Sequence, residues 1–183
     1  MTNYLYMRVL IAEDELDIAL SYKKALERKD HEVIITSDGE ECLKKYRLDI
    51  EQESKGTNNS SQSSSSSSSF DAVILDYKMP KKDGIEVAKE ILEMNSKQRI
   101  IFASAYVKDT LEDAVKELKR VVELIQKPFE ANALVDTLED KEVYENLKDL
   151  MKSVRRIREN QPTQKQIKDL LESLRKIQKG RTF

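Results

Sequence analysis

The sequence predicts an α/β fold in which five parallel strands form one sheet with helices on both faces. Five short apolar runs, rich in β-branched residues, are spaced along the first 125 residues. The stretches between them carry apolar residues at helical spacing. Strands and helices that alternate in this way form parallel sheets whose two faces are covered by the helices. We therefore expect a doubly wound (βα)5 domain, followed by a helical extension at the carboxyl end.

Each of the five apolar runs is five residues long, which suits a strand. They are RVLIA at 8–12, EVIIT at 32–36, DAVIL at 71–75, RIIFA at 99–103 and VVELI at 121–125. After the first and third runs, apolar side chains repeat with a period of three and four residues, which indicates one buried face of a helix. These residues are Ile18, Tyr22, Ala25 and Leu26 in the first helix, and Ile85, Ala88, Ile91 and Leu92 in the third.

A polar segment interrupts this alternation between the second helix and the third strand. Residues 54–69 contain no apolar side chain and end in seven consecutive serines. Such a segment cannot contribute to a core, so we expect a disordered loop. We interpret it as an inert insertion, with phosphorylation of the serines as the alternative.

Composition indicates one domain of ordinary size with an appendage. The chain has 183 residues, of which 39% are hydrophobic, too few for two full domains. Residues 1–139 carry 27 acidic and 20 basic side chains, whereas residues 140–183 carry 7 acidic and 12 basic ones. We therefore expect a first domain at 1–139 and a separate tail at 140–183. The single cysteine excludes an intramolecular disulfide framework and no charged-then-apolar leader precedes the first predicted strand, so we expect a cytoplasmic protein. No apolar stretch approaches the ~20 residues of a membrane helix.

The tail predicts two amphipathic helices separated at Pro162. In each helix the apolar residues fall within an arc of about 120°. They are Val143, Leu147, Leu150, Met151, Val154 and Ile157 in the first helix, and Ile167, Leu170, Leu171, Leu174 and Ile177 in the second. Two helices make a thin core, so we expect self-association or a partner protein to cover them. Packing on the chain's own first domain and nucleic-acid binding remain alternatives.

Polar residues follow four of the five predicted strands. Glu13 and Asp14 follow the first strand, Asp76 the third, Ser104 the fourth and Lys127 the fifth. An acidic residue such as Asp76 can simply open a turn, but the carboxyl ends of parallel strands also meet at one edge, where open α/β sheets bind ligands. Three carboxylates that lie close together require a cation, and an oxygen-rich site suits Mg²⁺.

A carboxylate, Mg²⁺ and a lysine at one place favour phosphoryl transfer to the carboxylate. Asp76 is the candidate nucleophile, since an Asp is already ionised near neutral pH. Lys127 and the Ser104 hydroxyl would hold the transferring oxygens. These residues thus predict a phosphoacceptor, and not an enzyme in the ordinary sense.

Four motifs in order, VLIAEDE, VILDYKMPKKDG, IIFASAY and LIQKPF, resemble the receiver domain of two-component response regulators. The resemblance covers roughly residues 5–138 and implies a flavodoxin-like fold. It implies that Asp76 accepts a phosphoryl group from a histidine kinase or a phosphotransfer protein, and that the chain assists its own phosphorylation and dephosphorylation. It further implies that Asp14 binds Mg²⁺ directly, Glu13 through water, and the backbone carbonyl of Lys78 as a further ligand.

The resemblance assigns the remaining roles and shows two departures. Ser104 would be the hydroxyl switch and Lys127 the phosphate-binding lysine, while Lys78 and Tyr106 would flank the site and modulate it. Where the family often has an aromatic residue three positions before the lysine, this chain has Leu124. The second departure is the Ser-rich segment, which lengthens the chain between the acidic pair and the phosphoacceptor.

Three other functions fit these residues less well. A hydrolase of the haloacid dehalogenase type would need a second Asp two residues after Asp76, where the chain has Lys78. A phosphorylation-independent adaptor would not need the acidic, Ser and Lys set. A transcription regulator would have to bind DNA through the basic tail, which is short for a helix-turn-helix domain.

Overall fold

The computed structural model describes residues 6–56, 70–105, 118, 122–140, 144–146 and 148–150. The chain divides into two compact units, Met1–Val135 and Asp136–Phe183. The first unit contains the whole sheet and all the strand ends at which polar residues were predicted to meet.

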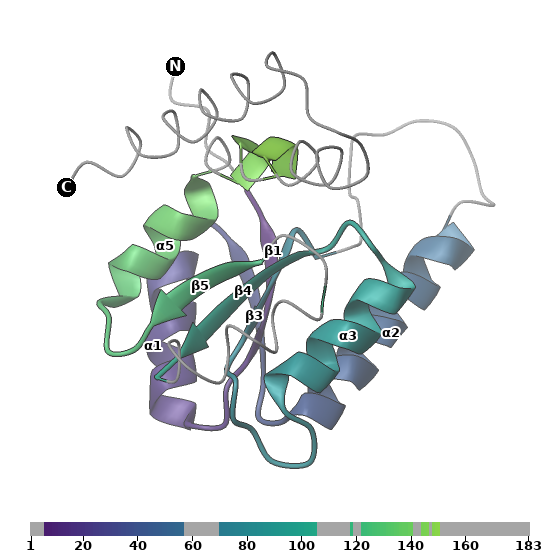
Figure 1. Cartoon of the computed structure of the whole chain (residues 1–183), viewed down its shortest axis with the longest axis horizontal. Helices are drawn as coiled ribbons and strands as arrows, with labels where there is room; N and C mark the ends of the chain where they lie inside the picture. Colours follow the sequence, from purple (N-terminus) through teal and green to yellow (C-terminus); the bar gives the residue numbers. More distant parts are fainter. Residues whose placement is uncertain are drawn as a thin grey trace, which may run out of the picture. The chain divides into compact units, whose positions relative to one another are not determined.

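One five-stranded parallel sheet forms the centre of the first unit (Figure 1). The strands lie in the order β2-β1-β3-β4-β5, so the predicted parallel α/β fold is confirmed. The last strand begins two residues later than predicted, at Glu123, where its pairing with β4 starts. The strands are β1 (Arg8–Ala12), β2 (Glu32–Thr36), β3 (Ala72–Leu75), β4 (Arg99–Ser104) and β5 (Glu123–Gln126).

Helices cover both faces of the sheet. Figure 1 shows α1 (Leu16–Glu27) on one face and α2 (Gly39–Gly56) with α3 (Gly84–Met94) on the other. Phe129, just before α5 (Ala131–Glu139), stacks on Tyr22 of α1 at 5.3 Å between ring centroids. Of the predicted fourth helix, only Leu118 belongs to the described residues.

The central strands β3 and β4 are apolar except for Arg99 and Ser104 at the two ends of β4, because helices cover both faces of the sheet. Every residue of β3 and β4 is buried, and strands covered on both sides have no polar face to alternate with.

The helix α3, which follows β3, begins with a capping box, in which the Asp83 side chain accepts a hydrogen bond from the Glu86 amide and the Glu86 side chain accepts one from the Asp83 amide. Such a box satisfies backbone groups that the first helical turn leaves without partners.

The helix before the Ser-rich segment is longer than predicted. We expected a loop from residue 54, but α2 continues to Gly56. The Glu and Lys residues at its end are good helix formers, and glycine is a common end point. The rest of the segment, residues 57–69, lies outside the described residues, so the predicted disorder stays a prediction.

The chain re-enters the fold at a tightly held aromatic residue. Phe70 is buried and stacks on Tyr46 of α2, and the Arg8 guanidinium lies 5.0 Å above its ring. Its carbonyl oxygen accepts a hydrogen bond from Gln98 at 3.1 Å. The first residue after the Ser-rich segment is therefore fixed by side chains from α2, β1 and the turn before β4.

The described part of the second unit is short. Residues 144–146 and 148–150 are helical, and Lys148 pairs with Glu145 at 2.9 Å. Most of the predicted tail helices lie outside the described residues, and their association stays a prediction. Among the helices that are described, none combines the length and the apolar character needed to cross a membrane.

Candidate functional site

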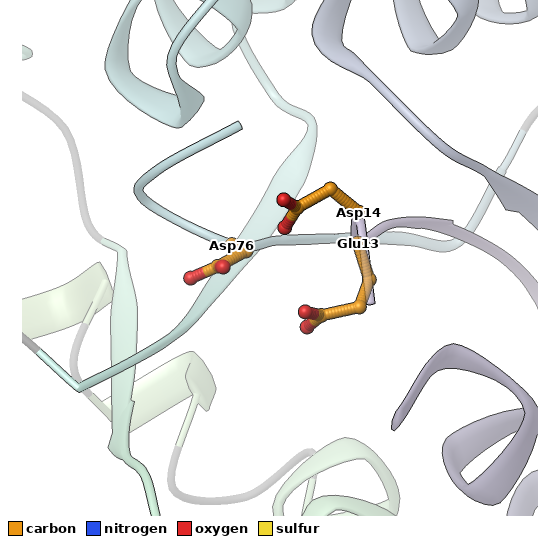
Figure 2. Close-up of side chains that lie close together, drawn as sticks. All are labelled: Glu13, Asp14 and Asp76. Carbon is orange, nitrogen blue, oxygen red and sulfur yellow. The ribbon is translucent and has the colours of Figure 1, made fainter. Parts of the chain in front are cut away.

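The ends of β1 and β3 bring three carboxylates together. Ala12 and Leu75 are paired in the sheet, and the residues that follow them are therefore neighbours. The backbone amide of Asp76 donates a hydrogen bond to the Ala12 carbonyl at 2.9 Å. Figure 2 shows the side chains of Glu13, Asp14 and Asp76, from which carboxylate oxygens lie within 4.8 Å of one another.

A lysine from the end of β5 reaches this acidic cluster. The Nζ atom of Lys127 lies 2.7 Å from Glu13 Oε2 and 3.4 Å from Asp76 Oδ2. The Lys127 amide donates to the carbonyl of Ser104 at 2.9 Å, which ties the lysine to the end of β4. A cis peptide bond joins Lys127 to Pro128. Strands 1, 3, 4 and 5 thus place the predicted polar residues at one edge of the sheet.

Burial opposes the ionised form of two carboxyl groups in the cluster. Burial is the main cause that raises the pKa of Glu13, and the charges of Asp76 and Asp14 raise it further, while Lys127 lowers it. The pKa of Asp76 is raised in the same way, chiefly by burial, and Lys127 again acts in the opposite direction. One ammonium group therefore offsets only part of the cost of gathering these carboxylates.

The donor set fits a hard divalent cation. The Oε1 atom of Glu13 is buried and has no hydrogen-bond partner among the described residues. A buried oxygen without a partner is costly, and a cation or its bound water would supply one. Glu13, Asp14 and Asp76 offer only oxygen ligands, which is the type of ligand that Mg²⁺ prefers.

The loop 77–83 connects Asp76, just after β3, to Gly84, the first residue of α3. Asp76 Oδ1 accepts a hydrogen bond from the Tyr77 amide at 2.7 Å, and the Gly84 amide donates to the Tyr77 carbonyl at 2.9 Å. A Cβ atom at Gly84 would lie 2.2 Å from the Asp76 carbonyl oxygen. No side chain fits there, so glycine is what allows α3 to start against the end of β3.

The other predicted site residues differ in their placement. Ser104 is the buried last residue of β4, and Lys78 is exposed in the loop 77–83. Leu124 lies in β5 opposite Phe102 and packs against the core. Tyr106 lies outside the described residues, so its expected modulating role stays a prediction.

The sequence reading missed two features of the site. It did not foresee that Glu13 pairs directly with Lys127, because the two residues are far apart in the chain and either could have faced solvent. It also did not predict that Gly84 lies against the Asp76 carbonyl, although a glycine directly after the capping residue of a helix can indicate a close approach of two backbone segments.

Comparison with known proteins identifies the family. The model of the response regulator receiver domain matches residues 9–139. The chain is 33% identical to the alkaline phosphatase synthesis transcriptional regulatory protein PhoP of Bacillus subtilis, over 72% of this chain and 48% of that protein. It is 28% identical to the chemotaxis protein CheY of Listeria monocytogenes, over 73% of this chain and 96% of that one.

A solved structure supports the same family assignment. The response regulator protein TrrA of Thermotoga maritima, crystallised in complex with Mg(2+)-BeF, is 27% identical with a TM-score of 0.53, covering 73% of this chain and 96% of that one. The chain spans about half the length of the transcriptional regulators it matches. Receiver domains bind Mg²⁺ at an acidic site, and response regulators interact with histidine kinases or phosphotransfer proteins. With its parallel sheet and the acidic cluster at the strand ends, this chain belongs to the response regulator receiver family of two-component signalling.

Proposed function

We propose that Asp76 accepts a phosphoryl group from a histidine kinase or a phosphotransfer protein in a Mg²⁺-dependent reaction. The observation that carries this proposal is the convergence of three carboxylates within 4.8 Å, with the ammonium group of Lys127 beside two of them. Glu13, Asp14, Asp76 and the backbone carbonyl of Lys78 would hold the ion.

In the transfer step, a carboxylate oxygen of Asp76 attacks the phosphorus of a phosphohistidine in line. An O–P bond forms on Asp76 while the P–N bond breaks, and the imidazole leaves with the electron pair of that bond. Bound Mg²⁺ supplies charge neutralisation for the oxygens of the transferring group. Asp76 is held for this attack by the hydrogen bond from the Tyr77 amide, which occupies Oδ1.

Lys127 and Ser104 would act on the phosphorylated state. Lys127 now contacts Glu13 and Asp76, and its ammonium group could move to an oxygen of a phosphoryl group on Asp76 with little displacement. The Ser104 hydroxyl, at the end of the neighbouring strand, would donate to another oxygen. Both interactions would depend on the negative charge of the phosphoryl group, so the positions of Lys127 and Ser104 would change when Asp76 is phosphorylated.

Output would pass through the receiver surface or the tail at 140–183, through a second copy of the chain or a downstream protein. A transcription regulator that uses the basic tail, and an adaptor that works without phosphorylation, are the alternatives. The full chain is expected to run larger than a monomer at micromolar concentration, and a truncation ending at Asp140 is expected to run as a monomer.

A small acyl-phosphate donor tests the proposed chemistry. The chain should gain one phosphoryl group with the donor and Mg²⁺ and none with EDTA, as measured by intact mass. Asp76→Asn should abolish the gain because it removes the ionised nucleophile while it keeps the shape of the side chain. Asp71→Asn, which alters an Asp at the opposite end of the same strand, should leave it unchanged. Wild-type uptake by Asp76→Asn would contradict the assignment of this site.

A further inference from the structure

One carboxylate joins the first turn of α2 to the loop that follows Asp76. Asp38 precedes α2, and its Oδ1 atom accepts a hydrogen bond from the Glu41 amide at 2.8 Å. Its Oδ2 atom accepts a hydrogen bond from Lys81 Nζ at 2.6 Å. Asp38 is buried, with 8% of its surface exposed, whereas Lys81 is exposed. Asp38 therefore caps a helix and holds the loop 77–83 at the same time.

The backbone of this loop also packs directly on the start of α2. A Cβ atom at Gly39 would lie 2.4 Å from the Lys82 carbonyl oxygen and 2.8 Å from a methyl group of Val87. Lys81 itself has a φ of 66°, in the left-handed region that favours glycine. A lysine in this conformation is unfavourable unless its side chain gains an interaction there, and the pair with Asp38 is such an interaction.

The position of the loop matters because it carries the backbone next to the phosphoacceptor. Its two ends are fixed by the hydrogen bond between the Gly84 amide and the Tyr77 carbonyl. Its far side, at Lys81 and Lys82, rests on α2 through the contacts just described. Lys78, whose carbonyl is the expected metal ligand, lies between these two anchors.

We propose that Asp38 is a positioning residue of the phosphoacceptor site, which holds the loop 77–83 in place through Lys81. The metal ligand in this proposal rests on the proposed function, whereas the anchoring of the loop does not. The hydrogen bond from Lys81 is the main cause that lowers the pKa of Asp38, so this carboxyl group stays ionised at neutral pH and the pair persists.

Adjacent lysines allow a matched test. Lys81→Gln removes the ammonium group that pairs with Asp38 in front of α2. Lys82→Gln removes the ammonium group of the adjacent lysine, which pairs with Glu90 of α3. Both variants lose one positive charge from the loop that follows Asp76. By Coulomb attraction alone, both should bind Mg²⁺ slightly more tightly. A positioning role predicts the opposite sign for Lys81→Gln only.

Two measurements on the full chain decide between these outcomes. The first is the hydrogen-exchange rate of the Gly84 amide without metal, which reports opening of the loop. The second is the Mg²⁺ dissociation constant, measured by calorimetry. We expect Lys81→Gln to raise the exchange rate and the dissociation constant about two- to fivefold each, which corresponds to the free energy of a partly exposed ion pair. Lys82→Gln should raise neither.

Asp38→Asn provides the reciprocal variant, since it keeps an oxygen to cap α2 and loses the charge that binds Lys81. It should reproduce the effect of Lys81→Gln, and the double variant should be no worse than either single one. Additive effects, or equal behaviour of Lys81→Gln and Lys82→Gln, would overturn the positioning role. A wild-type chain that does not bind Mg²⁺ would instead refute the proposed function, and with it the part of this proposal that concerns the metal.

Discussion

Asp14→Asn should stabilise the metal-free protein although it removes a proposed metal ligand. Asp14 lies in a cluster whose carboxylate oxygens are within 4.8 Å of one another, with Lys127 as the cation beside it. Two like charges at this distance repel by roughly 1 kcal/mol in water and about 3.5 kcal/mol at an effective dielectric constant of 20. Asp14 is exposed, so the lower value applies. We expect a gain of about 1 kcal/mol in the free energy of unfolding.

The dependence of stability on pH follows from the same cluster. The pKa values of Glu13 and Asp76 are raised in the folded state, mainly by burial. Just above the ordinary carboxyl range, the folded chain therefore binds more protons than the unfolded chain. Since stability falls with rising pH wherever the folded state holds more protons, the metal-free wild type loses stability as pH rises through this range. Asp14→Asn should show a smaller loss because one repelling charge is gone.

Urea denaturation in EDTA and in millimolar Mg²⁺ is the assay. In EDTA the Asp14→Asn variant should unfold at higher urea than the wild type. Added Mg²⁺ should stabilise the wild type and have little effect on the variant. Asp30→Asn, which removes an exposed charge in the turn between α1 and β2, serves as the control and should respond to Mg²⁺ like the wild type. A variant less stable than the wild type in EDTA would refute the reasoning.

Three further changes test other parts of the structure. Gly84→Ala places a Cβ atom 2.2 Å from the Asp76 carbonyl oxygen; it should lower the free energy of unfolding by about 2 kcal/mol or more and weaken Mg²⁺ binding, as measured by denaturation and calorimetry, and unchanged values would contradict the close approach. Glu123→Gln removes the carboxylate from the buried pair with Arg99, at 2.7 Å, and should cost about 3 kcal/mol in urea denaturation with Mg²⁺ affinity unchanged, whereas a cost below ~1 kcal/mol would show that the pair is dispensable. Deletion of 59–68 should change the stability by less than ~1 kcal/mol, since loop-closure entropy varies slowly with length, and should leave phosphoryl uptake intact; a marked drop of the denaturation midpoint would reveal ordered contacts.

Local pattern was enough to predict most of the strands, because a strand in the middle of a parallel sheet is buried on both faces and is apolar at nearly all of its positions. Four of the five strands begin within one residue of the predicted position. The edge strand β5 was less well placed. Its first residue, Glu123, is a charged side chain buried against Arg99, and such a pairing between strands is not visible in a local window.

The convergence of Glu13, Asp14, Asp76, Ser104 and Lys127 at one edge followed from the sequence by topology. Parallel strands end at the same side of a sheet, so polar residues placed directly after them must be neighbours. The order of the strands then determines which pairs touch. Because β1 lies next to β3, Glu13 and Asp76 share one ammonium group.

Only the tertiary structure decided how the loop 77–83 is held. The motif MPKKDG predicts a turn, but it does not indicate which acidic residue pairs with either of its two lysines. Lys81 binds Asp38 before α2, and Lys82 binds Glu90 on α3, because packing of the two helices on one face of the sheet brings those acids to the loop. The sequence by itself thus determined the fold class and which polar residues stand at the strand ends, since these depend on local periodicity and on the direction of the strands. The partners of individual charged side chains depend on distances between elements far apart in the chain, and the three-dimensional packing alone sets those distances.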